Sequence, residues 1–145
     1  MLRHCLSFAL NSMKKALLIE QDSDLRASLT MFLELANFAI VDTQDSVTGL
    51  QQAIALQPEL IFFDLDISLA EGHGILYAFR SQSKTANIPV IFIGENITDN
   101  IHQELLNLGA SGCIGKPFNF IELFRLGKKK LPELKLIDLT DLMGS

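Results

Sequence analysis

The sequence predicts an α/β fold, a (βα)₅ arrangement in which helices cover both faces of a doubly wound parallel sheet. Five short apolar runs alternate along the chain with amphipathic segments, and the runs occupy residues 16–20, 39–43, 60–64, 89–94 and 112–115. The third and fourth runs are apolar throughout Leu60–Phe63 and Val90–Ile93, which is typical of strands buried on both faces of a sheet. Strands that alternate with helices form right-handed βαβ units, and such units predict a parallel sheet.

The amphipathic segments have the spacing of helices that pack one face on this sheet. Asp22 or Ser23 is the expected N-cap of the first helix. The apolar face of that helix comprises Leu25, Leu29, Phe32, Leu33 and Ala36. Ser46 is the expected cap of the second helix, and Gly109 is expected to close the fourth as a C′ glycine. These later helices are predicted at residues 46–56, 75–79, 98–108 and 118–130.

The length of 145 residues fits one domain, because ordinary domains have about 100–150 residues. We expect this domain at residues 13–131, with an N-terminal extension outside the fold at residues 1–12 and a C-terminal tail at residues 132–145. The first twelve residues are too weakly apolar for a secretory signal. No run approaches the roughly 18 apolar residues that a membrane span requires, so we expect no membrane association.

Charge and cysteine content narrow the class of protein. The net charge of −5 and the pI near 5.1 argue against nonspecific binding to nucleic acid, which depends on Lys and Arg. A short basic cluster at Arg125 and residues 128–130 is explained by the C-terminal end of a helix. Cys5 and Cys113 lie far apart in the sequence, which fits a reducing cytoplasm better than a disulfide framework.

Polar residues stand where the predicted strands end. In order along the chain they are Glu20, Gln21, Asp22, Asp64, Asp66, Glu95 and Lys116. Ligands bind at the carboxyl ends of the strands in open α/β sheets, so we expect these side chains to converge on one crevice. Clustered carboxylates suit a hard divalent ion such as Mg²⁺. A carboxylate in this crevice could act as a nucleophile toward a phosphoryl group, with the metal and the lysine neutralising charge.

Simpler explanations hold for some of these positions. Asp22 is better explained as a helix cap than as a ligand. Cys113 is better explained as a small buried hydrophobic residue than as a redox sensor. Asp64 could be an ordinary strand-end carboxylate and Lys116 an ordinary surface lysine, but for both residues a role in the crevice is the better explanation.

Four segments in register carry a resemblance to a known family. They are LLIEQDSDLR at residues 17–26, PELIFFDLD at 58–66, IPVIFIG at 88–94 and GASGCIGKPF at 109–118. Together they resemble the receiver domain of bacterial response regulators, the CheY-like module of two-component signalling, over most of the chain. The resemblance implies a flavodoxin-like sheet with strand order 2-1-3-4-5.

The resemblance also implies roles for individual residues. Asp64 matches the phosphoacceptor, and Lys116 matches the lysine that contacts the phosphoryl group and precedes a proline, usually through a cis peptide. The implied metal site consists of Glu20, Asp64 and the backbone carbonyl of Asp66, and the implied ion is Mg²⁺.

Three positions depart from the family pattern. Gln21 stands where the second acid after strand one usually contributes to metal binding, so we expect Mg²⁺ to bind weakly. Gly94 stands where a threonine or serine hydroxyl follows the phosphoryl group, and Cys113 stands at the position of the aromatic switch residue. Asp64 and Lys116 thus match the family pattern, but the hydroxyl and the aromatic ring that respond to the phosphoryl group are missing.

Three functions compete. The first is an atypical single-domain receiver in a His–Asp phosphorelay, and the second is a pseudo-receiver that binds partners without phosphorylation. The third, a nucleotide- or flavin-binding enzyme on the same fold, is disfavoured because Glu20, Gln21 and Asp22 replace a glycine-rich phosphate loop after the first strand. No enzyme activity is expected beyond Mg²⁺-dependent self-phosphorylation from a donor and autodephosphorylation.

The resemblance implies protein partners rather than DNA. Upstream we expect a sensor histidine kinase or a phosphotransfer protein. Downstream we expect a protein partner, or a part of the protein outside this chain, because 145 residues leave no room for a DNA-binding region. The face formed by the fourth helix, the fifth strand and the fifth helix would serve for a homodimer.

Overall fold

A computed structural model describes residues 14–117 and 119–130 of the chain. The expected extension at residues 1–12, the expected tail at 132–145 and the expected helix start at 118 lie outside these residues. The helices and strands follow in the order β1 (Lys14–Ile19), α2 (Ser23–Leu35), β2 (Phe38–Thr43), α3 (Ser46–Leu56), β3 (Leu60–Asp64), α4 (Leu69–Arg80), β4 (Val90–Gly94), α5 (Asp99–Asn107), β5 (Gly112–Gly115) and α6 (Phe120–Lys130).

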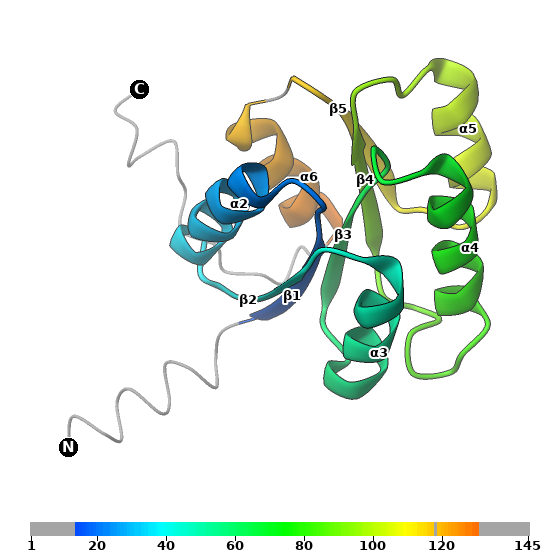
Figure 1. Cartoon of the computed structure of the whole chain (residues 1–145), viewed down its shortest axis with the longest axis horizontal. Helices are drawn as coiled ribbons and strands as arrows, with labels where there is room; N and C mark the ends of the chain where they lie inside the picture. Colours follow the sequence, from blue (N-terminus) through cyan, green and yellow to red (C-terminus); the bar gives the residue numbers. More distant parts are fainter. Residues whose placement is uncertain (1–13, 118, 131–145) are drawn as a thin grey trace.

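The five described strands form one parallel sheet in the order β2-β1-β3-β4-β5. Helices α2 and α6 cover one face, and α3, α4 and α5 cover the other (Figure 1). The predicted α/β fold and the strand order 2-1-3-4-5 are therefore confirmed. The order reverses between β1 and β3, which is the place where such sheets bind ligands.

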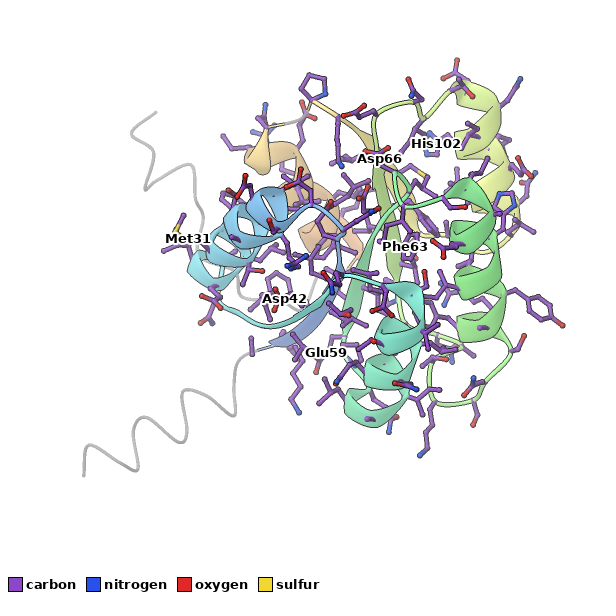
Figure 2. The ribbon with its side chains drawn as sticks, viewed as in Figure 1. Met31, Asp42, Glu59, Phe63, Asp66 and His102 are labelled. Atoms are coloured by element: carbon purple, nitrogen blue, oxygen red, sulfur yellow. The ribbon has the colours of Figure 1, made fainter. Side chains whose placement is uncertain are left out.

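The central strands separate two apolar layers. Leu18 and Phe62 pack with α2 on one face, whereas Leu17 and Phe63 pack with α3 and α4 on the other. Every residue of β3 and β4 is buried, as the continuous apolar runs predicted. Figure 2 shows Phe63 inside the fold and Met31 pointing outward from α2.

The helix caps agree with the prediction in part. Asp22 caps α2 by accepting the N–H groups of Asp24 and Leu25. The predicted cap at Ser46 is wrong, because Asp45 caps α3 through the N–H of Thr48. Since a carboxylate one residue earlier already accepts that donor, Ser46 becomes the first residue of the helix.

Helix α4 begins at Leu69, well before the segment 75–79 that periodicity identified. The side chain of Ser68 caps it by accepting the N–H of Glu71. At Gly72 an added Cβ would lie 2.5 Å from a side-chain carbon of Leu65, so the missing side chain lets the helix pass close to the β3–α4 loop. This glycine therefore helps to fix the loop that follows Asp64.

Helix α5 is capped by Thr98 and followed by Gly109, whose φ is +109°. The C′ glycine was predicted, and its positive φ explains why a glycine stands there. Within the described residues, no helix is long and apolar enough to cross a membrane.

Candidate functional site

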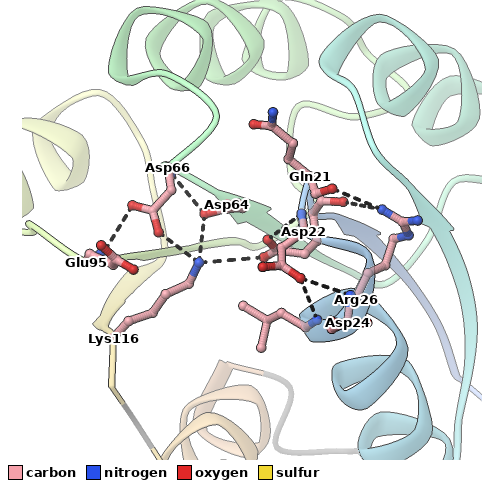
Figure 3. Close-up of polar contacts among 10 residues, drawn as sticks. Gln21, Asp22, Asp24, Arg26, Asp64, Asp66, Glu95 and Lys116 are labelled. Carbon is pink, nitrogen blue, oxygen red and sulfur yellow. Dashed lines mark hydrogen bonds and ion pairs between the residues drawn. The ribbon is translucent and has the colours of Figure 1, made fainter.

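The polar residues at the strand ends meet in one open cleft of about 420 Å³. Its described lining consists of Glu20, Gln21, Asp22, Asp64, Asp66, Glu95 and Lys116, the set that the sequence placed at one crevice. Figure 3 shows Asp64, Asp66 and Lys116 directed toward one another across the cleft. The convergence follows from the parallel order of the strands, which brings the carboxyl ends of β1, β3, β4 and β5 to one edge of the sheet.

Lys116 is the one cation among the described residues that line the cleft. Its Nζ lies 2.8 Å from Oδ2 of Asp66, 3.2 Å from Oδ1 of Asp64 and 3.9 Å from Oε2 of Glu20. Burial alone would lower the pKa of Lys116, but the hydrogen bond to Asp66 and the charges of Glu20 and Asp64 outweigh burial and raise it. The lysine is therefore a firmly charged donor between three carboxyl groups. Its peptide bond to Pro117 is cis.

Glu20 is completely buried beside Asp64 at the switch point of the sheet. Its Oε1 accepts the N–H of Asp22 at 3.2 Å, while Oε2 has no hydrogen-bond partner among the described residues. Burial, and next the adjacent carboxyl group of Asp64, raises the pKa of Glu20 to about 8 against the opposing charge of Lys116. Without a further cation, Glu20 thus holds a proton at neutral pH.

Asp64 ends β3 and is 2 % exposed. Its Oδ1 accepts the N–H of Asp66 at 2.9 Å as well as Nζ of Lys116. A carboxylate with these partners is held in a fixed orientation in the lining of the cleft. The position fits a nucleophile that is held in place by its own loop and by one cation.

Arg26 holds the β1–α2 loop, a role that the sequence analysis missed. Its Nη1 donates to the carbonyl of Glu20 at 2.8 Å and to that of Gln21 at 3.4 Å (Figure 3). Its Nε pairs with Asp42 at 3.3 Å. The guanidinium therefore ties the acidic loop to the neighbouring strand β2. One signal for this role was present in the sequence. Arg26 is a cation in the first turn of α2, directly after an acidic loop, and acidic residues are more usual in the first turn of a helix.

The carboxylate of Asp66 makes contacts that were also missed. The sequence placed this side chain at the crevice without naming its partners, and the resemblance implied only a backbone carbonyl ligand. In the structure Oδ1 of Asp66 accepts the N–H of Glu95 at 3.0 Å and Oδ2 accepts from Lys116. One side chain thus joins the loops after β3, β4 and β5.

The three atypical positions lie at or near the cleft. Gln21 lines its rim, and Figure 3 shows its side chain pointing away from Lys116. Gly94 ends β4, where an added Cβ would lie 3.2 Å from Cβ of Leu65 and 3.3 Å from Cγ1 of Ile97. Cys113 pairs with Phe92 in the sheet and packs against the apolar layer. The side chain is half-buried, and burial raises the pKa of this thiol to about 11, which agrees with an unreactive packing residue rather than a redox sensor.

The donor set of the cleft fits Mg²⁺. Glu20 offers an oxygen without a hydrogen-bond partner among the described residues, and Asp64 lies beside it. Among these residues no group of three or more His, Cys, Asp or Glu side chains is arranged to hold a metal ion. An ion here would rely on two carboxylates, a backbone carbonyl and water, which is a normal set for Mg²⁺.

Comparisons with known proteins agree with this geometry. The chain is 29 % identical over 113 residues to the DNA-binding dual master transcriptional regulator RpaA of Synechocystis, which covers 77 % of this chain and 46 % of RpaA. The chain therefore spans about half the length of this relative.

Solved structures show the same fold. The chemotaxis response regulator CheY4 of Vibrio cholerae superimposes with a TM-score of 0.76 at 23 % identity, covering 82 % of this chain and 99 % of CheY4. The receiver domain of the sensor histidine kinase PA1611 from Pseudomonas aeruginosa, solved with magnesium in its active-site cleft, has a TM-score of 0.75 at 18 % identity, with coverages of 84 % and 100 %. Residues 16–126 match the family of response regulator receiver domains, so the chain belongs to this family and contains the receiver domain of a two-component response regulator.

Proposed function

We propose that this chain is an atypical receiver in which Asp64 accepts a phosphoryl group in a His–Asp phosphorelay, with output through protein contacts. The observation that carries the proposal is the placement of the Asp64 carboxylate. It is 2 % exposed, held by the N–H of Asp66 and by Lys116, and lines a cleft rich in acids.

The reaction needs a nucleophile and a cation, and both are present. An oxygen of Asp64 would form a bond to phosphorus while the bond between phosphorus and the donor's imidazole nitrogen breaks. That nitrogen keeps the electron pair and takes up a proton from solvent water, so the step balances. Lys116, 3.2 Å from Asp64, would neutralise charge on the transferred group.

Glu20, Asp64 and the backbone carbonyl of Asp66 would hold Mg²⁺. When bound, the ion would neutralise the carboxylates and the incoming phosphoryl oxygens. The amide of Gln21 adds no charge to this site, so the affinity would be modest. The receiver domain of PA1611, which was solved with magnesium in its cleft, supports the choice of ion.

A second function is favoured by a different observation. Gly94 carries no hydroxyl, and the neighbouring Leu65 and Ile97 fill the space where a side chain would begin. The group that usually transmits phosphorylation is therefore missing, which favours a pseudo-receiver that binds partners without phosphorylation. Under either function the chain is a signalling module and not an enzyme with a separate substrate.

The proposed partners follow from the first function. A sensor histidine kinase or phosphotransfer protein would donate the phosphoryl group in the cytoplasm. A downstream protein would bind the face formed by α5, β5 and α6, which is also the proposed homodimer face. RpaA is named as a DNA-binding regulator, but we propose no DNA contact for this receiver because the chain carries a net charge of −5.

Intact-mass measurement tests the proposed function. The protein is incubated with Mg²⁺ and a small phosphodonor, in parallel with Asp64→Asn. We expect the added mass of one phosphoryl group in the native chain and none in the variant. A mass gain that persists in Asp64→Asn would contradict the assignment of Asp64, and no gain in the native chain would favour the pseudo-receiver.

A further inference from the structure

The carboxylate of Asp66 accepts hydrogen bonds from two groups of the cleft that also holds Asp64, the ammonium of Lys116 and the backbone N–H of Glu95. Its Oδ2 lies 2.8 Å from Nζ of Lys116, and its Oδ1 lies 3.0 Å from the backbone nitrogen of Glu95 (Figure 3). Asp66 is also tied to Asp64, because its own N–H donates to Oδ1 of Asp64 at 2.9 Å. The negative group is therefore fixed next to the proposed acceptor.

An anion that enters this cleft has few other groups to bind. The described lining is acidic except for Gln21 and Lys116. A phosphoryl group on Asp64 needs positive or N–H partners for its oxygens. The single N–H of Glu95 already donates to Asp66, and Lys116 shares its ammonium between Asp66 and Asp64.

Gly94 makes this arrangement sterically available. The Cβ that Gly94 lacks would lie 3.4 Å from Oδ1 of Asp66, so a branched side chain at position 94 would compete with the carboxylate for the same space. The loss of a side chain at Gly94 and the position of Asp66 are thus two parts of one local structure.

We propose that Asp66 is a tethered internal anion that occupies the phosphoryl-binding position and competes with anions from outside. The proposal deepens the proposed function, because it rests on Lys116 and the N–H of Glu95 being the phosphoryl donors. The side chain of Asp66 is 34 % exposed, so it has room to rotate out of the cleft. Access to Asp64 is then controlled by the release of Asp66, which an incoming anion or partner must bring about.

Anion binding in the absence of metal tests this proposal directly. Sulfate, as a tetrahedral anion, is titrated into native protein, Asp66→Ala and Asp66→Asn in the presence of a metal chelator, and the amide resonance of Glu95 is followed by NMR. We expect sulfate to bind Asp66→Ala at least about tenfold more tightly than the native protein, because two charge-assisted hydrogen bonds become available. Asp66→Asn should lie between them, since its amide oxygen can still accept from Glu95.

Asp22→Asn is the matched control. Asp22 lines the same cleft and carries the same charge, but among the described residues it forms no ion pair with Lys116, which pairs with Glu20, Asp64 and Asp66. Asparagine is as good an N-cap as aspartate, so helix α2 is kept. We expect a change of no more than about twofold, which corresponds to a partly screened charge.

Two results would overturn the proposal. One is equal sulfate affinity in the native protein and both Asp66 variants, and the other is an equal gain in Asp22→Asn, which would reduce the effect to net charge. The same proteins are then treated with Mg²⁺ and a phosphodonor and weighed. Tighter sulfate binding without any mass gain would refute phosphorylation at Asp64 and leave the internal anion standing, so the two failures are distinguishable.

Discussion

Gly94 and Gly115 are direct neighbours in the register of β4 and β5, yet their surroundings differ. A Cβ on Gly94 would lie within 3.4 Å of Leu65, Ile97 and Asp66, whereas a Cβ on Gly115 would have no described atom within 4 Å. The pair therefore offers a matched test of what fills the space of the missing hydroxyl.

Gly94→Thr should destabilise the protein, and Gly115→Thr should not. The first change overpacks the loops after β3 and β4, which typically costs about 1–3 kcal/mol. The second places a β-branched residue at an open strand end, where it is neutral or mildly stabilising. Urea unfolding of both variants measures the difference. Equal midpoints would mean that Leu65, Ile97 and Asp66 move aside freely.

The buried Glu20 predicts a pH-dependent stability. Its pKa is about 8 in the folded protein against 4.5 for a free glutamate. Because the folded pKa is the higher one, the contribution of Glu20 is fully present below pH 4.5 and is lost as the pH rises through 8. Between pH 6 and 8.5 the loss has a slope of at most about 1.4 kcal/mol per pH unit.

Glu20→Gln checks this assignment, since glutamine keeps the shape and cannot ionise. In metal-free buffer the variant should lose less stability than the native protein between pH 6 and 8.5. Urea unfolding at the two pH values provides the comparison. Parallel pH profiles for the two proteins would show that Glu20 does not titrate in this range.

Gln21→Asp should strengthen Mg²⁺ binding. The new carboxylate adds one formal negative charge at the rim of the cleft, and Mg²⁺ affinity increases with ligand charge. Titration followed by NMR measures the dissociation constant, which we expect to fall at least about fivefold, a change of about 1 kcal/mol. Gln21→Asn, which shortens the side chain without adding charge, is the control. If both variants matched the native protein, Gln21 would not face the metal position.

Cys113 should react slowly with thiol reagents in the native state. Burial raises its pKa to about 11, so the thiolate is scarce at pH 8. Cys5→Ser leaves Cys113 as the one cysteine of the chain, and absorbance during reaction with a disulfide reagent gives its rate. The rate should increase at least about tenfold after unfolding in urea, because the pKa then returns to about 8.5. Similar rates in both states would reopen a redox role.

The sequence predicted the fold because its strongest signals are physical requirements of a parallel sheet. Runs such as Leu60–Phe63 are apolar on both faces only when helices cover both faces. The same order of strands brings Glu20, Asp64 and Lys116 together, so their convergence was also predictable. Their assigned roles, and the domain limits at residues 13 and 131, remain predictions.

The details that depend on side-chain rotation were not predictable. Asp45 and Ser46 are both good N-caps, and the sequence does not tell which of the two turns toward the helix. Likewise, nothing in the sequence tells whether Asp66 presents its carbonyl or its carboxylate to the cleft. The contact with Lys116 depends on the loop geometry and on the room left at Gly94.

The last prediction concerns the face formed by α5, β5 and α6. In this family a hydroxyl on strand four follows the phosphoryl group and an aromatic ring on strand five moves with it, as the resemblance implies. Gly94 has no hydroxyl and Cys113 has no ring, so these contacts cannot differ between two states, and a ligand shifts an equilibrium only through contacts that differ. We therefore expect little rearrangement of residues 98–130 when Asp64 carries beryllofluoride with Mg²⁺.

Amide NMR spectra with and without beryllofluoride measure this response, and Asp64→Asn is the control for binding elsewhere. The expected shifts are confined to the loops around Asp64, Asp66 and Glu95, because the arriving anion displaces the Asp66 carboxylate from its two donors. A change that stops at these loops would mean that the partner surface at α5, β5 and α6 is largely preformed, or that the signal leaves through the loop around Glu95 and Asn96. Large shifts spread through residues 98–130 would contradict the prediction. They would require a route of conformational change that does not involve Gly94 or Cys113. Such a route would begin where Ile97 and Ile101 pack beside Leu65.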